Sequence, residues 1–156
     1  MIFKKFNELT KDELEKIINK HYNHWSQYSP TMNYENTKNK FENIYAKNDT
    51  IPFGIAMFED DILIGFLVFK DHCLEKYLEY TPWISDVMIF DEYRSQGYGT
   101  KMVNEALRVL NSLGYSKAYL WTDKAPKFYE KIGFTYEHEV EKNEGGIGKL
   151  YSKKIK

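Results

Sequence analysis

Eight residues in the middle of the chain decide the fold, because two contrasting patterns meet at Tyr93-Arg94-Ser95-Gln96-Gly97-Tyr98-Gly99-Thr100. The stretch before them, residues 83–90, is mostly apolar and predicts a strand. The stretch after them repeats apolar residues at steps of three and four, which predicts an amphipathic helix ending at Gly114. The apolar residues of this helical stripe are Met102, Val103, Ala106, Leu107, Leu110 and Leu113. The order is therefore strand, glycine turn and helix N-terminus.

A glycine turn that opens a helix after a strand favours the binding of an anion. The first N–H groups of a helix have no partner within the helix, and the helix dipole adds a partial positive charge there. Gly97 and Gly99 have no β-carbon, so a phosphate can approach this backbone closely. The turn therefore predicts a phosphorylated cofactor.

Two common phosphate-binding motifs do not fit this turn. A P-loop closes with Gly-Lys-Ser/Thr, whereas Gly99 is followed by Thr100 and only then by Lys101. A dinucleotide fingerprint needs a third glycine at the position of Met102.

Two segments, in the right order, resemble the GNAT family of N-acetyltransferases. Arg94-x-x-Gly97-x-Gly99 after a strand resembles the family's acyl-CoA pyrophosphate loop. Residues 125–134, Ala-Pro-Lys-Phe-Tyr-Glu-Lys-Ile-Gly-Phe, resemble its second CoA-facing segment, Ala-x-x-Phe-Tyr-x-Lys-x-Gly-Phe. The resemblance covers about residues 83–138. It implies an α/β (α+β) fold with a mixed, mostly antiparallel sheet, splayed at two central parallel strands and flanked by about four helices. It also implies a single N-acetyltransferase domain over residues 1–156, whereas pattern alone reaches only a single α/β domain.

The resemblance implies that acetyl-CoA is the co-substrate and that its acetyl group passes to a primary amine by direct attack. It assigns protonation of the CoA thiolate to Tyr129, since a tyrosine with an ordinary pKa of ~10 keeps its proton at neutral pH. It places the backbone N–H groups of residues 87–89 along the pantetheine arm, the first of them polarising the thioester carbonyl. The residues expected to bind the cofactor are Val87, Met88, Ile89, Arg94, Ser95, Gln96, Gly97, Tyr98, Gly99, Thr100 and Phe128.

Several of these residues also have a purely structural interpretation. The side chains of residues 87–89 can pack in a core while their backbone binds the cofactor. Arg94 can be a solvated turn residue, and Tyr98 is expected to contribute its N–H rather than its ring. Phe128 either flanks the cofactor arm or seals the core. Tyr129 is one of 13 tyrosines, and its place in the second segment is what favours a catalytic role.

The general base is where the sequence departs from the family pattern. Many family members place Glu or His on the strand before the glycine turn, at the positions of Trp83 and Ser85. Asp86 is adjacent, but strand alternation directs it to the face opposite Ser85 unless a bulge intervenes. We therefore expect deprotonation through water or bulk solvent. Thr122 stands where the family commonly has an Asn whose side chain contacts the cofactor, and we do not assign that contact to Thr122.

The resemblance places the acceptor beneath the loop between the first two helices. Aromatic faces there can enclose a cationic amine, and ordinary packing explains any one of them equally well. The residues concerned are His24, Trp25, Tyr28, Met32 and Tyr34. A small-molecule amine and a protein amine are both open as acceptors, and the resemblance allows a homodimer. The alternative function is a non-catalytic acyl-CoA-binding or regulatory module.

Composition narrows the class of partner. The 156 residues carry 22 basic and 23 acidic side chains, a net charge of −1, which gives no field for nucleic acid or for a membrane surface. The longest apolar run, residues 62–69, is too short to cross a bilayer, and the N-terminal residues have no signal-peptide core. Cys73 is alone and the four histidines lack ligand spacing, so no metal is expected. These features favour a cytoplasmic protein.

Local signals predict the remaining elements. Thr10 and Glu13 form the pattern of a capping box, which starts a helix running toward Trp25. A weaker helix is expected at about residues 36–46. Further expected elements are a β-hairpin over residues 53–58 and 62–69, a strand at 118–122, and a terminal hairpin over 134–140 and 148–155 that turns at Gly145-Gly146.

Overall fold

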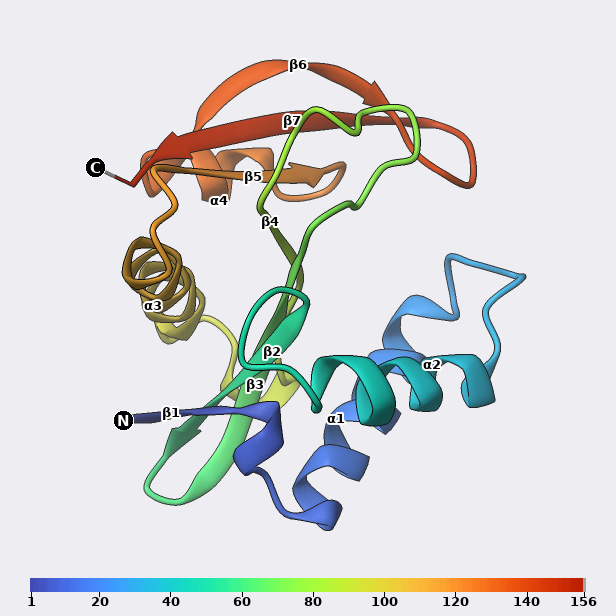
Figure 1. Cartoon of the computed structure of the whole chain (residues 1–156), viewed down its shortest axis with the longest axis vertical. Coiled ribbons are helices and arrows are strands. Elements are labelled where there is room, and N and C mark those ends of the chain that lie inside the picture. The colour runs from blue at the N-terminus through green and yellow to red at the C-terminus, as the bar shows by residue number, and fades with distance from the viewer. Residues whose placement is uncertain (156) are drawn as a thin grey trace. The chain divides into compact units, whose positions relative to one another are not determined.

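The computed structural model describes residues 1–155, and these residues form four α-helices and seven strands (Figure 1). The helices are α1 (Lys11–Trp25), α2 (Tyr34–Lys40), α3 (Tyr98–Ser112) and α4 (Pro126–Lys131). The strands are β1 (Ile2–Lys5), β2 (Phe53–Glu59), β3 (Ile62–Lys70), β4 (Trp83–Ile89), β5 (Lys117–Thr122), β6 (Thr135–Glu141) and β7 (Ile147–Lys154). No helix within residues 1–155 combines the length and apolar character that a membrane span requires.

The strands form one mixed sheet in the order β1-β2-β3-β4-β5-β7-β6. The pairs β1–β2, β2–β3, β5–β7 and β6–β7 are antiparallel, whereas β4 and β5 pair in parallel with Trp83 opposite Tyr119. This pairing lies at the start of β4, where the Tyr119 N–H also donates to the Pro82 carbonyl at 3.0 Å. The mixed, mostly antiparallel sheet predicted from the sequence is confirmed.

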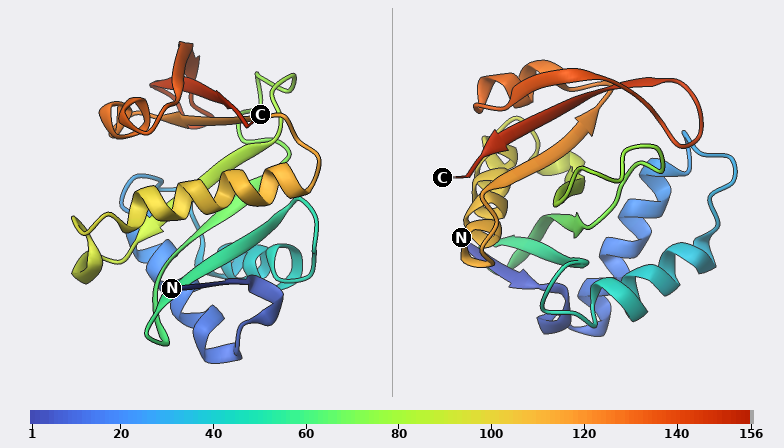
Figure 2. Two further views of the ribbon diagram at one scale, coloured as in Figure 1. Left: turned by 90° about the vertical axis from the view of Figure 1, so that its left-hand side faces the viewer. Right: turned by 45° about the horizontal axis from the view of Figure 1, so that its top comes forward.

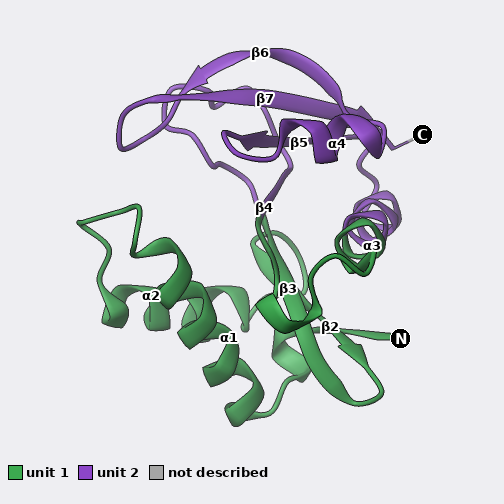
Figure 3. Ribbon diagram, turned by 180° about the vertical axis from the view of Figure 1, so that it is seen from behind, with its two compact units in different colours: residues 1–69, 86–102 green, residues 70–85, 103–156 purple. Residues whose placement is uncertain are grey.

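The chain divides into two compact units, coloured separately in Figure 3. The first contains residues 1–69 and 86–102, and the second contains residues 70–85 and the chain from Val103 onward. Strand β4 and helix α3 each contribute residues to both units. Each unit is described by itself below.

The first unit is built on a continuous apolar core, to which α1, β2 and β3 contribute side chains. Helix α1 begins at a capping box, because the Thr10 hydroxyl accepts from the Glu13 N–H at 3.1 Å and the Glu13 carboxylate accepts from the Thr10 N–H at 2.9 Å. Its apolar face buries Ile17 and Ile18 completely. Other members of this core are Phe6, Phe41, Tyr45, Ala56, Phe58, Leu63, Phe66, Val68, Met88 and Phe90.

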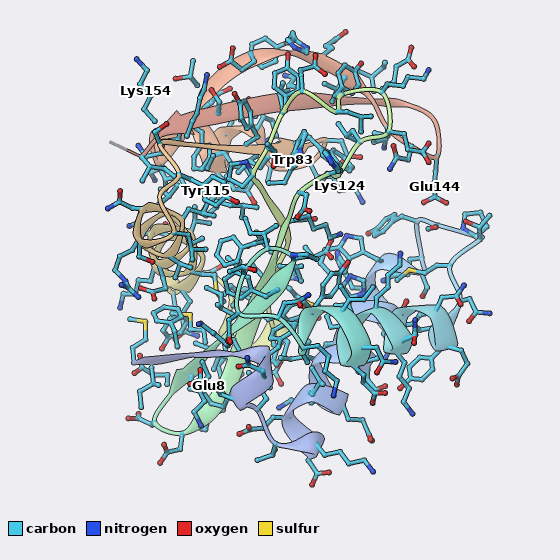
Figure 4. The ribbon with its side chains drawn as sticks, viewed as in Figure 1. Glu8, Trp83, Tyr115, Lys124, Glu144 and Lys154 are labelled. Atoms are coloured by element: carbon cyan, nitrogen blue, oxygen red, sulfur yellow. The ribbon has the colours of Figure 1, made fainter. Side chains whose placement is uncertain are left out.

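The second unit holds the antiparallel strands β5, β7 and β6 side by side (Figure 2). Trp83, labelled in Figure 4, is fully buried here with Leu74, Val140 and Leu150. Its ring N–H donates to the Tyr80 carbonyl at 2.7 Å. The β6–β7 hairpin turns at Gly145 and Gly146, as predicted, and both residues have positive φ.

Two boundaries differ from the sequence prediction. Helix α2 begins at Tyr34 rather than near residue 36, since the Asn33 side chain caps it by accepting from the Asn36 N–H at 3.1 Å. After Lys40 the helix widens into a π-helical turn at Phe41–Tyr45 that buries both aromatic ends. The connection between α1 and α2 is therefore residues 26–33, so three of the residues assigned to it, His24, Trp25 and Tyr34, lie on helices instead.

Candidate active site

Strand β4 carries the three residues whose backbone was expected to bind the pantetheine arm. Met88 is buried, and Val87 and Ile89 are half-buried. The neighbouring strand β3 comes so close to β4 that a β-carbon on Gly65 would lie 2.5 Å from the Met88 carbonyl oxygen. A glycine at this position therefore lets β3 approach the backbone of residues 87–89 closely.

The strand contains an irregularity at Asp86, whose φ is +54°. A left-handed backbone is strained for any residue with a β-carbon, and aspartate is one of the few such residues that adopt it at moderate cost. A left-handed residue interrupts the alternation of side chains along the strand. Regular alternation would direct Asp86 to the face of the sheet opposite Ser85, and this irregularity means that the two side chains need not lie on opposite faces.

The glycine turn leads from β4 into α3 through a short 3₁₀ turn at Asp91–Tyr93. Ser95 and Gly97 have left-handed backbones, with φ of +63° and +84°. Helix α3 begins at Tyr98, and its early hydrogen bond runs from the Lys101 N–H to the Gly97 carbonyl at 3.4 Å. The first N–H groups of α3, which have no acceptor within the helix, follow directly on the left-handed Gly97.

Arg94 ties the glycine turn to the end of β4. Its Nε donates to the Ile89 carbonyl at 3.0 Å, and its guanidinium lies 3.2 Å from the Asp91 carboxylate. The side chain is about half exposed, so the remaining guanidinium N–H groups face solvent. Arg94 thus combines the structural role considered from the sequence with donors that a phosphate could use.

Tyr129 lies on α4 in the second unit, with its ring 5.0 Å from Phe128 and 5.8 Å from Phe134. Burial raises the pKa of the Tyr129 hydroxyl to about 12. Entry into α4 is fixed by Thr122, whose hydroxyl accepts from the N–H groups of Lys124 and Ala125 at 3.3 and 3.0 Å. The Thr122 oxygen is therefore engaged with its own turn.

The two positions where the family commonly has a base hold no group that accepts a proton at neutral pH. Trp83 is a core residue of the second unit, and Ser85 is half-buried with its own polar contacts. This agrees with the departure from the family pattern noted in the sequence.

The structure adds a pair that the sequence did not single out. His21 Nε2, on the buried face of α1, lies 3.4 Å from the Asp86 carboxylate. The His21 ring packs against Trp25, Phe41 and Phe66, with centroids 4.5, 4.8 and 6.1 Å away. Its Nδ1 is buried and has no hydrogen-bond partner among residues 1–155. Leaving such an atom unpaired costs about 1–3 kcal/mol.

The residues expected near the acceptor form aromatic contacts at the end of α1. The His24 ring lies 4.7 Å from Trp25 and 5.7 Å from Tyr28, whose side chain is 56% exposed. Tyr34 packs edge-on against Tyr22 and donates its hydroxyl to Asn19 at 2.7 Å. Met32 is half-buried in the connection between the helices. In the part of the chain that the structure describes, no three His, Cys, Asp or Glu side chains converge as metal ligands do.

Comparison with known proteins identifies the family. The model of the acetyltransferase (GNAT) family matches residues 12–134, which is most of the chain. The chain belongs to this family. A curated relative, the uncharacterized N-acetyltransferase CgeE of Bacillus subtilis strain 168, is 36% identical over 90 residues. That match covers 49% of this chain and 35% of CgeE, so the chain spans about a third of that relative's length.

Solved structures of GNAT acetyltransferases share the fold. An aminoglycoside 6'-acetyltransferase type Ii has a TM-score of 0.76 at 19% identity, covering 100% of this chain and 98% of its own. An aminoglycoside 6'-N-acetyltransferase complexed with coenzyme A has the same TM-score and coverage at 16% identity. PaiA N-acetyltransferase of Thermoplasma acidophilum, also in complex with coenzyme A, has a TM-score of 0.66 at 18% identity and 99% coverage of both chains. The predicted GNAT family and fold are confirmed.

Proposed function

We propose that this GNAT chain transfers an acetyl group from acetyl-CoA to a primary amine. The observation that carries the proposal is the left-handed Gly97 in the turn that follows β4, immediately before the first N–H groups of α3. This is the arrangement in which a diphosphate is bound by backbone rather than by side chains. Family membership supports the view that this diphosphate belongs to acetyl-CoA. Two solved structures of the same fold, both in complex with coenzyme A, support it further.

In this proposal the cofactor is bound mainly by the backbone. The diphosphate accepts from N–H groups of residues 95–100, with the exposed guanidinium edge of Arg94 and the Thr100 hydroxyl as further donors. The pantetheine arm runs along the backbone of Val87, Met88 and Ile89. Phe128 offers an apolar face to the same arm. Gly97 and Gly99 leave room for the phosphates, and Ser95, Gln96 and Tyr98 contribute backbone.

The proposed chemistry is direct attack of a neutral amine on the thioester. The Val87 N–H stabilises the oxyanion, a contribution of about 2.7–4 kcal/mol for a donor of this kind. The carbon–sulfur bond then breaks as Tyr129 donates its proton to the leaving sulfur. The proton that the nitrogen loses on becoming an amide passes through solvent to the Tyr129 oxygen and restores its hydroxyl. Because its pKa is raised to about 12, the Tyr129 hydroxyl holds that proton throughout the neutral and mildly alkaline range.

The acceptor is proposed to be a cationic primary amine of a small molecule or a protein, bound near the aromatic side chains at the end of α1. Two of the structural neighbours are named as aminoglycoside 6'-acetyltransferases, and an aminoglycoside is a small-molecule amine. Aromatic faces contribute about 0.5–2 kcal/mol to such a contact.

A second candidate is a non-catalytic module that binds acyl-CoA. It is favoured by Trp83 and Ser85, which replace acid or histidine at the positions where many family members hold a base. Tyr129, in the position of the thiolate acid, argues for the enzyme.

Release of free thiol separates the two candidates. The protein is incubated with acetyl-CoA and a panel of primary amines, and the thiol is followed over a range of pH. The enzyme releases thiol in proportion to time and protein with at least one amine. Saturable acetyl-CoA binding without thiol release across the panel, up to alkaline pH, would instead assign the chain to the non-catalytic class.

A further inference from the structure

We propose, on the basis of the function proposed above, that Asp86 accepts the proton of the acceptor ammonium and that His21 is its positioning residue. It is an alternative to the deprotonation through water or bulk solvent that we expect from the sequence. The inference comes from the place of Asp86 in the strand, its pairing with His21, and the path of side chains from this pair to the protein surface.

Asp86 is the neighbour in the chain of the residue proposed to polarise the thioester. Asp86 immediately precedes Val87, whose N–H is the proposed donor to the thioester carbonyl. Its backbone is left-handed, a conformation that glycine would adopt with less strain. Aspartate tolerates this conformation at moderate cost, and its carboxylate offers a reason why the position does not hold the less strained glycine.

The pairing with His21 gives the carboxylate a fixed direction. His21 Nε2 lies 3.4 Å from Asp86 Oδ2, and both side chains are largely buried, with 10% and 18% of their surfaces exposed. Three aromatic rings hold the imidazole from α1, the π-helical turn and β3. With a hydrogen on Nε2, His21 donates toward the carboxylate and leaves Nδ1 without a hydrogen.

The unpaired Nδ1 indicates that His21 is more than a packing residue. The residue is 93% buried, and this atom has no partner within residues 1–155. A phenylalanine would fill the same aromatic surroundings without burying an unpaired polar atom. The histidine is therefore explained by its other nitrogen, the one that faces Asp86.

The pair is continuous with the side chains proposed to receive the acceptor. His21 contacts Trp25, Trp25 contacts His24, and His24 contacts the exposed ring of Tyr28. A cationic amine that enters across these rings meets its first buried carboxylate at Asp86. Lys20, the residue before His21 on α1, lies 3.9 Å from Glu92. The other titratable groups on α1, the π-helical turn and β3 are Lys11, Asp12, Glu13, Glu15, Lys16, Tyr22, His24, Glu42, Tyr45 and Lys70.

The proposed step balances as follows. An N–H bond of the ammonium breaks and an O–H bond forms on Asp86, which leaves a neutral amine with a free electron pair. That pair forms the new bond to the thioester carbon, and the carbon–sulfur bond breaks as Tyr129 gives its proton to the sulfur. The proton that the nitrogen then loses on becoming an amide passes through solvent and restores the Tyr129 hydroxyl. Asp86 then gives its proton to water, so one proton is released for each amide formed.

The test compares Asp86→Asn with Asp61→Asn. Asparagine keeps the shape of the side chain and also tolerates a left-handed backbone, so the strand geometry is retained. Asp61 has φ of +66° in the exposed β2–β3 turn, which makes it a matched control for the same substitution in the same conformation. We measure kcat/KM for propylamine, putrescine and tyramine between about pH 6 and pH 10 at saturating acetyl-CoA, together with the melting temperature.

We expect Asp86→Asn to lower kcat/KM by about 10²–10⁴-fold at neutral pH, with Asp61→Asn unchanged. The deficit should shrink as pH rises, because the amine then loses its proton in solution before binding. His21→Phe should shift the acidic limb of the wild-type profile while leaving acetyl-CoA affinity unchanged. A purely structural role for the pair would lower activity by one factor at every pH, together with the melting temperature.

The outcomes are distinct. Suppose that the wild type releases thiol and that kcat/KM of Asp86→Asn either stays within about twofold of wild type or falls by the same factor at every pH. Either result overturns this inference and leaves the proposed function standing. Wild type that releases no thiol with any amine overturns the proposed function and this inference with it.

Discussion

Removing one oxygen atom, with Tyr129→Phe, tests the proposed acid without changing the aromatic ring. Burial raises the pKa of Tyr129 to about 12, so at pH 10 only about 1% of it is ionised, against about half of an ordinary tyrosine. The proton donor is therefore intact over the whole range in which the amine is free to attack. We expect kcat to fall by about 10²–10⁴-fold, while the affinity for acetyl-CoA stays within about twofold of wild type.

Tyr151→Phe is the matched control in the same unit. Tyr151 is fully buried, its pKa is also raised to about 12, and its hydroxyl donates to the Glu130 carboxylate at 2.5 Å. Loss of this hydrogen bond should cost about 1–1.5 kcal/mol, at the low end because Glu130 is exposed, and lower the melting temperature by about 2–6 °C. Its kcat should not change.

The assay measures steady-state thiol release at saturating amine, acetyl-CoA affinity by calorimetry, and thermal melting for both variants. The expected pattern is that Tyr129→Phe loses turnover and keeps its melting temperature, and that Tyr151→Phe does the reverse. If Tyr129→Phe keeps kcat within about threefold of wild type, Tyr129 is not the acid. A loss of turnover matched by an equal loss of acetyl-CoA affinity would also refute this reasoning.

Three further predictions concern stability. Gly65→Ala places a β-carbon 2.5 Å from the Met88 carbonyl oxygen, and the resulting strain should lower the free energy of unfolding by about 1–3 kcal/mol in urea titrations; an unchanged midpoint would contradict the close approach of β3 and β4. Thr10→Ala removes the cap of α1 and should cost about 1 kcal/mol by the same measurement, whereas no loss would mean that the capping box is not formed in solution. A tyrosine with a folded pKa above its unfolded value stabilises the fold below pH 10 and loses that contribution as pH rises toward 12. The stability of Tyr129→Phe should therefore fall less than that of wild type between about pH 10 and pH 12, and parallel curves would refute the raised pKa.

Local signals explain why much of the fold could be predicted from the sequence. The capping box at Thr10, the stripe that becomes α3, and the turn at Gly145 and Gly146 each depend on residues a few positions apart. The mixed sheet and its parallel pair were expected instead from the resemblance of two short motifs. The π-helical turn at Phe41–Tyr45 has no comparable signal, because two buried aromatic residues at its ends fit an α-helix equally well.

The His21–Asp86 pair was not predicted from the sequence, because it is a contact between residues distant in the chain. His21 and Asp86 are far apart in sequence, and each alone has an ordinary interpretation, as a histidine on an apolar helix face and an acid in a strand. The left-handed backbone of Asp86 was foreseen only as a condition, since a strand pattern does not reveal where alternation breaks. An aspartate inside an otherwise apolar strand, directly before the expected oxyanion donor, was the one local signal available.

Binding of acetyl-CoA to Gly97→Ala, compared with Gly145→Ala, tests the central claim most directly. Both glycines have left-handed backbones, with φ of +84° and +94°, and open space around the position of an added β-carbon, so the two substitutions impose similar strain. The account predicts saturable heat for acetyl-CoA with wild type, the same affinity for Gly145→Ala, and a weakening of at least about tenfold for Gly97→Ala, equivalent to about 1.4 kcal/mol. No saturable binding by folded wild type, or equal affinities for all three proteins, would contradict it.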